Sequence, residues 1–142
     1  MAQSEVSADR INAYRGTEYQ VGRGHDAILL RVDTRSRPLL GLYASSGQCC
    51  AVFITAYNPF SQLHGAEAND AANARLRAEL ERQTNHIIEG AGIDPSGAWP
   101  EEQSFLALGM GLEAAKTLGM QFGQNAIVWA GDDAIPRLIM LC

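Results

Sequence analysis

Residues 50–57 carry the sequence CAVFITAY and are followed at once by Asn58 and Pro59. Nearly every position is apolar, so both faces of an extended segment here are apolar, which is typical of a central strand. Proline cannot donate a hydrogen bond to a strand ladder, and it restricts the residue before it. We therefore predict a central strand over residues 50–57 that ends at Asn58.

The longest predicted helix follows this strand, over residues 66–89. The segment is rich in alanine, lacks glycine and proline, and is closed by Gly90 and Gly92. Asn73 shares one face of this helix with two leucines, so its carboxamide is expected to point toward the core.

Alternating and periodic apolar residues predict the remaining elements on both sides of this pair. Upstream, the pattern predicts a hairpin of two strands and then a short helix after Pro38. Downstream, it predicts a loop, a strand, a second main helix and a closing hairpin. In chain order the ranges are 17–23 and 27–33 for the first hairpin, 35–43 for the short helix, 92–100 for the loop, 103–109 for the strand, 111–122 for the second main helix, and 125–130 with 136–141 for the closing hairpin.

This order of elements indicates the fold class. Strands outnumber helices, and hairpins lie near both ends, which favours an α+β domain. We predict a two-layer fold with a mixed or antiparallel sheet of about five to six strands and two main helices on one face. A chain of 142 residues can build one core, so one domain is expected over residues 1–142, with residues 1–10 as a loose leader.

Composition argues against several classes of protein. The net charge is −5 and no cluster of lysine and arginine occurs, so we expect no binding to nucleic acid or to an anionic membrane. No apolar run approaches the roughly 20 residues that span a bilayer. Residues 1–16 lack the apolar stretch of a signal peptide, and three cysteines with an adjacent pair do not form a disulfide framework. We therefore expect a soluble cytoplasmic protein.

Signals for a metal or a cofactor are weak. The three histidines, His25, His64 and His86, are scattered and match no metal-ligand spacing. Residues 109–114, GMGLEA, match a dinucleotide-binding fingerprint between a strand and a helix. Too few residues follow for the further strand–helix units of a doubly wound domain. We interpret this segment as a tight turn and expect neither a metal nor a cofactor.

Polar residues at otherwise apolar positions are the candidate functional residues. A buried carboxamide without hydrogen-bond partners costs about 1–3 kcal/mol, so these groups must bind one another, the backbone or a ligand. In a pocket, burial raises the pKa of Glu102 and suits it to act as a general base. In that case Asn58, Asn73 and Gln124 orient the substrate. The candidate set is Thr55, Asn58, Asn73, Glu102, Ser104 and Gln124.

These residues also lie in segments that resemble a known family. The chain is similar to the DUF3293 family, a bacterial family of unknown function, in five ordered segments. The resemblance implies a small bacterial protein of one domain with no assigned activity, and the six candidate residues match polar positions of the family pattern. The segments are YRGTEY at 14–19, FITAYNP at 53–59, N-x-x-L-x-x-x-L at 73–80, WPEEQSF at 99–105 and FGQNAIV at 122–128.

Two functions of different classes fit these observations. The first is a non-enzymatic ligand- or protein-binding or regulatory module, whose partner is an unknown small molecule or protein. The second is a small hydrolase or transferase in which Glu102 acts as general base. Convergence of Asn58, Asn73, Glu102 and Gln124 on an open pocket favours a ligand site or an enzyme. Mutual bonding of these groups in a closed network favours a role in scaffolding.

Overall fold

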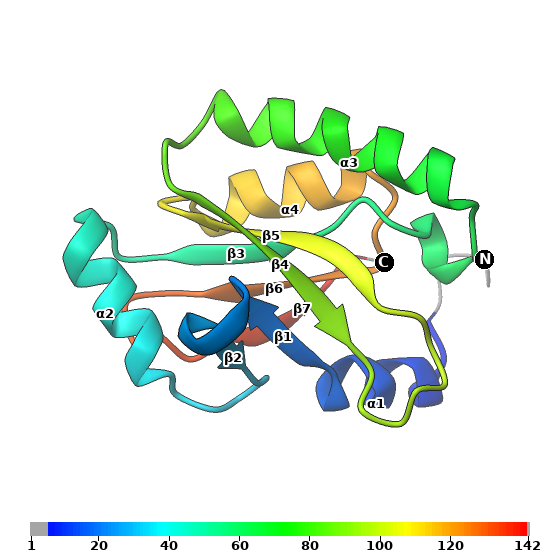
Figure 1. Cartoon of the computed structure of the whole chain (residues 1–142), viewed down its shortest axis with the longest axis horizontal. Helices are drawn as coiled ribbons and strands as arrows, with labels where there is room; N and C mark the ends of the chain where they lie inside the picture. Colours follow the sequence, from blue (N-terminus) through cyan, green and yellow to red (C-terminus); the bar gives the residue numbers. More distant parts are fainter. Residues whose placement is uncertain (1–5, 142) are drawn as a thin grey trace.

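The computed structural model describes residues 6–141 and is shown in Figure 1. Within these residues the chain forms four α-helices, two 3-10 turns and seven strands. The helices are α1 (Ala8–Gly16), α2 (Arg37–Ser46), α3 (Ala66–Glu81) and α4 (Leu112–Gln121), and the 3-10 turns are η2 (Gly24–Asp26) and η3 (Pro59–Ser61). The strands are β1 (Glu18–Val21), β2 (Ile28–Leu30), β3 (Ala51–Ile54), β4 (Ile87–Ile93), β5 (Glu102–Leu108), β6 (Ala126–Ala130) and β7 (Arg137–Met140).

All strands join one antiparallel sheet in the order β2-β1-β4-β5-β3-β6-β7. The apolar strand β3 lies inside the sheet, between β5 and β6, as the sequence predicts. Beyond the strands' ends, the Asp33 N–H donates to the Pro136 carbonyl at 2.7 Å. Because Asp33 follows one edge strand and Pro136 precedes the other, this bond shows that the sheet curls until its edges approach.

The two faces of the sheet pack against different helices (Figure 1). On one face, Val52 and Ile54 of β3 pack with the buried residues of α3 and α4, such as Leu76 and Leu118. On the opposite, concave face, Phe53 packs in a cluster with residues of α2. The α+β class is correct. The expected two main helices on one face correspond to α3 and α4, but the described chain has four helices, and α2 is as long as α4. The predicted two-layer arrangement is wrong, because α2 covers the second face.

The predicted helix over residues 66–89 is too long, and this error hides a strand. Helix α3 ends at Glu81, and Ile87–Ile93 forms β4 between β1 and β5. Gly90 is a glycine of this strand rather than a helix terminator, since a Cβ there would lie 2.1 Å from the Gln20 carbonyl oxygen. This strand raises the count to seven in the part of the chain that the structure describes, instead of five to six.

The expected loose leader at residues 1–10 is also wrong in part. Helix α1 begins at Ala8, where the Ser7 hydroxyl caps it by accepting the Arg10 N–H at 3.1 Å. This helix buries none of its residues, so it has no apolar stripe for the sequence to reveal. Residues 1–5 lie outside the described part of the chain.

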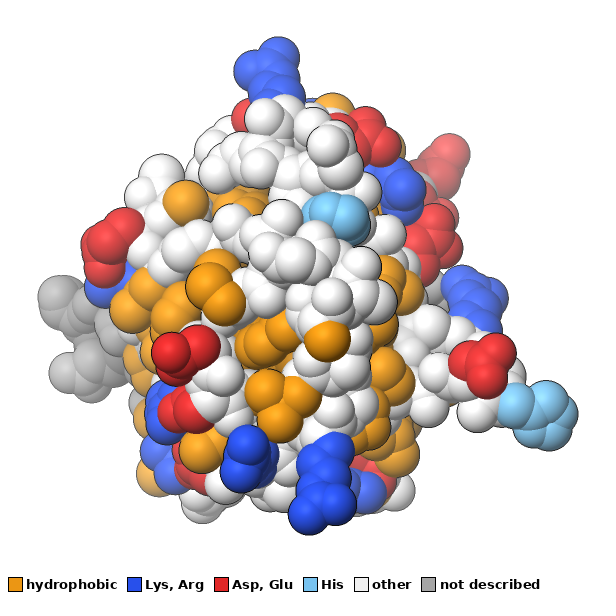
Figure 2. All heavy atoms as spheres, turned by 90° about the vertical axis from the view of Figure 1, so that its left-hand side faces the viewer, with side chains coloured by type: hydrophobic (Ala, Val, Ile, Leu, Met, Phe, Trp, Pro, Cys, Tyr) orange, Lys and Arg blue, Asp and Glu red, His pale blue; other side chains and the backbone are white. Residues whose placement is uncertain are grey.

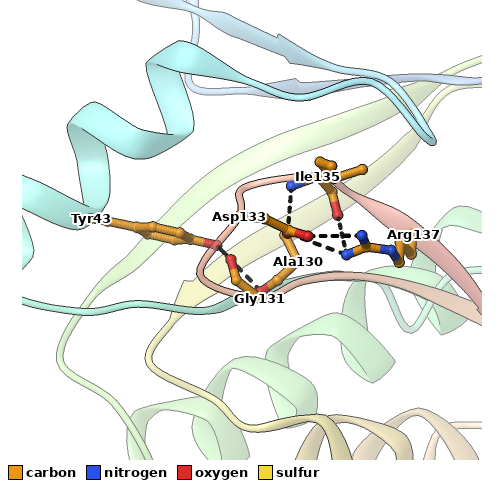
Figure 3. Close-up of polar contacts among 6 residues, drawn as sticks. All are labelled: Tyr43, Ala130, Gly131, Asp133, Ile135 and Arg137. Carbon is orange, nitrogen blue, oxygen red and sulfur yellow. Dashed lines mark hydrogen bonds and ion pairs between the residues drawn. The ribbon is translucent and has the colours of Figure 1, made fainter.

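Helix α2 is fastened to the sheet through Tyr43 (Figure 3). The buried Tyr43 hydroxyl donates toward the carbonyls of Gly131 at 2.8 Å and Ala130 at 3.3 Å, at the end of β6. In the same turn, Asp133 and Arg137 form an ion pair at 2.8 Å. At this end of the molecule, hydrophobic side chains are interspersed with charged and other polar groups (Figure 2).

Replacing Tyr43 by phenylalanine tests this attachment. Tyr43→Phe leaves buried carbonyls without their hydroxyl donor, so the free energy of unfolding should fall by about 1 kcal/mol in urea denaturation. Tyr57→Phe is the matched control, because its hydroxyl binds the Asp70 carboxylate at the surface, and it should change stability by less than about 0.5 kcal/mol. Equal effects of the two variants would contradict the role given to Tyr43.

Candidate functional site

A pocket lies at the end of the sheet where β3 ends and β5 and β6 begin, beneath α1. In Figure 1, α1, η3 and the loop after β4 lie around this end of the sheet. Its lining is mostly apolar, and it offers about 100 Å³ in which the centre of a water-sized molecule fits. The lining polar residues include Arg10, Tyr14, Thr55, Asn58, Ser61, Asp94, Trp99, Glu102, Ser104, Gln124 and Asn125.

The strand register explains which side chains reach the pocket. Side chains alternate between faces, and directly paired residues share a face. Tyr19 of β1 pairs with Gly92 of β4, and Gly92 pairs with Glu102 of β5. Glu102 therefore projects from the concave face beside Gly92, which has no side chain to fill the space. Tyr19 and Phe53 meet edge to face, with ring centroids 5.2 Å apart, and form an apolar wall.

Glu102 is the central polar group of the pocket. Its Oε2 accepts hydrogen bonds from Asn58 Nδ2 at 2.8 Å and Trp99 Nε1 at 2.9 Å. Among residues 6–141, no group donates a hydrogen bond to its other oxygen, Oε1. Burial raises the pKa of Glu102, and the Trp99 and Asn58 hydrogen bonds and the Arg10 charge oppose that rise without cancelling it.

Asn58 is fixed from several directions, so its amide is held in place against Glu102. Its backbone is left-handed, with φ of 48°, a conformation that asparagine tolerates better than most residues. Asn69 of α3 accepts the Asn58 N–H at 2.9 Å, and its own amide donates to Asn58 Oδ1 at 3.0 Å. The His64 N–H also donates to Oδ1 at 2.9 Å. With Oδ1 satisfied in this way, Nδ2 is directed to the carboxylate.

The turn after Asn58 stores backbone strain beside the pocket. Phe60 and Ser61 both have a φ of 58°, and left-handed conformations of this kind cost about 1–3 kcal/mol each. The turn is held by the Phe60 N–H donating to the Gly123 carbonyl at 2.7 Å. The Ser61 hydroxyl bonds to the Tyr14 hydroxyl at 2.5 Å and accepts from Asn125 Nδ2 at 3.0 Å. The turn thus places a hydroxyl pair in the pocket wall.

The structure brings five of the six sequence-predicted residues to the pocket lining. Thr55 donates to the Gln103 carbonyl at 2.6 Å, and Ser104 donates to the Glu102 carbonyl at 2.9 Å. Gln124 Nε2 donates to the Tyr57 carbonyl at 3.1 Å and so helps to position the chain after β3. The polar groups of these three side chains therefore bind backbone carbonyls, and the same side chains line the pocket.

Asn73 is the exception among the predicted residues. It is not among the residues that line the pocket. Its Oδ1 accepts the Ala56 N–H at 2.8 Å, and its Nδ2 donates to the Gln103 carbonyl at 2.8 Å. The carboxamide points into the protein, as the helical pattern predicts, and joins the end of β3 to the start of β5. This position supports the backbone beneath the site.

Sequence reasoning missed several groups of the site. Arg10 of α1 places its guanidinium 4.4 Å from the centre of the Trp99 ring. Tyr14, Trp99 and Asn125 lie inside the family-like segments, which was a signal that could have found them. Arg10 belongs to a helix that has no apolar stripe, so no amphipathic pattern marks this helix or Arg10 in the sequence.

In the described part of the chain, no group of three or more His, Cys, Asp or Glu residues is arranged to hold a metal ion. None of the helices described combines the length and apolar character needed to cross a membrane.

Comparison with known proteins gives one match. Residues 54–127, just over half of the chain, match the model of a family described as "Protein of unknown function (DUF3293)". Neither the curated proteins nor the solved structures yield a match. The matched segment contains Glu102, Asn58 and the other sequence-predicted residues, whereas α1 lies outside it.

Glu102→Gln should reveal the half-buried carboxylate through the pH dependence of stability. Because the folded-state pKa is raised, the proton on Glu102 stabilises the fold at low pH, and this stability is lost as pH rises from about 4.5 through the folded pKa. Glutamine stays neutral and can accept the same two hydrogen bonds. The free energy of unfolding of the variant minus that of the native protein should therefore be larger at pH 7 than at pH 4, which means that the variant gains relative stability as pH rises.

Glu101→Gln is the matched control for this measurement. It removes the same charge one residue away, at an exposed position. Urea denaturation at a series of pH values should show no such trend for this variant. A Glu102→Gln variant that loses stability relative to the native protein as pH rises would show that Glu102 has a lowered pKa and contradict the assignment.

Proposed function

The chain belongs to the DUF3293 family, and we propose that it is a non-enzymatic module that binds a small organic molecule in the pocket beneath α1. One observation carries this proposal. A mostly apolar pocket contains a half-buried carboxylate that uses one oxygen for the protein, while its other oxygen takes no hydrogen bond from residues 6–141. Apolar walls with a few well-placed polar groups are typical of small-molecule sites.

The roof of the pocket is suited to admitting a ligand. Helix α1 buries none of its residues, and polar contacts attach it at the pocket rim. These contacts include the Tyr14–Ser61 hydroxyl pair, the Tyr19 hydroxyl donating to the Tyr14 carbonyl at 2.6 Å, and the Arg10–Trp99 stack. An ion pair between Arg15 and Asp33, at 3.9 Å, also attaches the helix. Elements with few buried contacts open at low free-energy cost. A ligand can therefore enter under α1 without disturbing the sheet.

Gly92 leaves space in the pocket, although the strand itself does not require a glycine at this position. Its φ is not in the left-handed region, and a Cβ there would meet only the Thr17 methyl group at 3.8 Å. Glycine inside a strand weakens the strand and leaves no side chain to pack. Because Gly92 lines the pocket between Tyr19 and Glu102, its absent side chain leaves the cavity open.

Nuclear magnetic resonance of the two indole N–H groups tests the proposal. Trp99 donates to Glu102 in the pocket, whereas Trp129 donates to the Met110 carbonyl and packs with the cluster on the opposite face of the sheet. Mixtures of small aryl and alkyl amines, alcohols and carboxylates should include compounds that shift the Trp99 signal and leave the Trp129 signal in place.

Gly92→Val adds bulk to the pocket and should abolish these shifts. Gly41→Val is the matched control, because Gly41 lies exposed on α2 with open space around it. The control should bind as the native protein does, and thermal unfolding should confirm that both variants fold. Shifts of Trp99 that survive Gly92→Val, or no shift with any mixture, would overturn the proposal.

A small hydrolase or transferase is the second candidate, favoured by the chemistry of Glu102. A carboxylate with a raised pKa and one oxygen without a hydrogen-bond donor among residues 6–141 can accept a proton from a bound water or substrate. Asn58 then orients Glu102, and Gln124 lies in the wall where it can orient substrate. Asn73 acts only through the backbone it holds.

Turnover measurements separate this candidate from simple binding. If Glu102 is a general base, turnover of any ester or amide that binds should rise with pH through the raised pKa of Glu102. Glu102→Gln should lower the rate by a factor of about 10² or more, while Glu101→Gln should not change it. Turnover that is unaffected by Glu102→Gln would remove this candidate.

A further inference from the structure

The charges that line the pocket have different roles. Three charged residues line it among those described, Arg10, Asp94 and Glu102. Asp94 lies in the loop after β4 and serves a turn: its carboxylate accepts from the Ser96 N–H at 2.9 Å and the Trp99 N–H at 3.0 Å. Arg10 lies on α1, with its guanidinium over the Trp99 ring. Glu102 is the charged group that projects from the concave face of the sheet.

Glu102 has no direct cationic partner within residues 6–141. Its two donors, the Asn58 amide and the Trp99 indole, are both neutral. Arg10 acts on it through space and forms neither a hydrogen bond nor an ion pair with it in this part of the chain. The other titratable groups that face it, the phenols of Tyr14, Tyr19 and Tyr57, supply no positive charge.

An ionised carboxylate in this position favours a positive partner. Removing a carboxylate from water is costly unless an opposite charge compensates it, and interaction with that charge is stronger in a low-dielectric site than in water. The raised pKa of Glu102 agrees with incomplete compensation by the protein. Elsewhere in the pocket, the lining includes the apolar side chains of Phe53, Val128 and Leu138.

We propose that the ligand is an organic cation, whose protonated nitrogen donates to Glu102 Oε1 and whose apolar part lies against Phe53, Val128 and Leu138. The inference rests on the proposed function and names the ligand class for the same pocket. A nitrogen that carries both charge and hydrogen satisfies the free carboxylate oxygen and neutralises its charge in one contact.

Three probes of similar size test the charge of the ligand. Phenethylamine carries an ammonium group, 2-phenylethanol is neutral, and 3-phenylpropionate carries a carboxylate. Affinities are measured at pH 7.5 on the full chain, from the chemical shift of the Trp99 indole N–H. The amine should bind about tenfold or more tightly than the alcohol, since hydrogen bonds to charged groups contribute more than neutral ones. The carboxylate should bind most weakly.

Glu102→Gln should remove the preference for the amine over the alcohol and leave the shape of the pocket unchanged. Glutamine offers a neutral acceptor of the same shape, so the amine and the alcohol should bind this variant within about threefold of each other, a difference well below 1 kcal/mol. Glu101→Gln, at the exposed neighbouring position, should keep the full preference. A preference for the amine that persists in Glu102→Gln would overturn the inference.

Gly92→Val separates failure of this inference from failure of the proposed function. If amine and alcohol bind the native protein equally and Gly92→Val abolishes both, the pocket binds ligands but the cation assignment is wrong. If 3-phenylpropionate binds the native protein most tightly and Gly92→Val abolishes its binding, charge recognition is assigned to Arg10. That result would also overturn the inference. If the probes bind equally well to the native protein and to Gly92→Val, both the pocket and the cation assignment fail.

Discussion

The side-chain amide of Asn58 holds together the end of the sheet on which the pocket depends. Through Oδ1 it is tied to Asn69 of α3 and to the His64 backbone, and through Nδ2 it positions Glu102 of β5. Asparagine suits the left-handed backbone that follows β3, and its amide supplies an acceptor and donors in one group. One residue thereby couples the helical layer, the strained turn and the half-buried carboxylate.

The curled antiparallel sheet explains why a pocket forms at this end. The concave face is filled by α2 and its cluster at one end, whereas the other end is covered by α1, a helix without buried residues. The glycines of β4 permit this shape in two ways. Gly90 allows the backbone of β1 and the ring of Phe53 to approach closely, and Gly92 leaves space beside Glu102. On the opposite face, α3 and α4 pack against the strands that carry the walls.

Local sequence patterns predict those elements whose burial produces a clear pattern of apolar and polar residues. The apolar run before Asn58 identified β3, and polar residues at apolar positions identified Asn58, Glu102 and the wall residues. Gly90 misled the prediction, because a glycine that closes a helix and a glycine demanded by a neighbouring strand look alike in one sequence. The sequence alone does not separate Asn73 from the pocket residues, because periodicity shows that a side chain faces the core, but not which side of a sheet it reaches.

A crystal structure of the native protein grown with phenethylamine tests whether Glu102 binds an organic cation in the pocket. We expect the probe beneath α1, with its nitrogen within about 3.2 Å of Glu102 Oε1 and its ring against Phe53. The hydrogen bonds from Asn58 and Trp99 to Oε2 should remain in place. A pocket closed by the side chains of Tyr14 and Trp99, with both oxygens of Glu102 bonded to protein groups, would contradict this expectation.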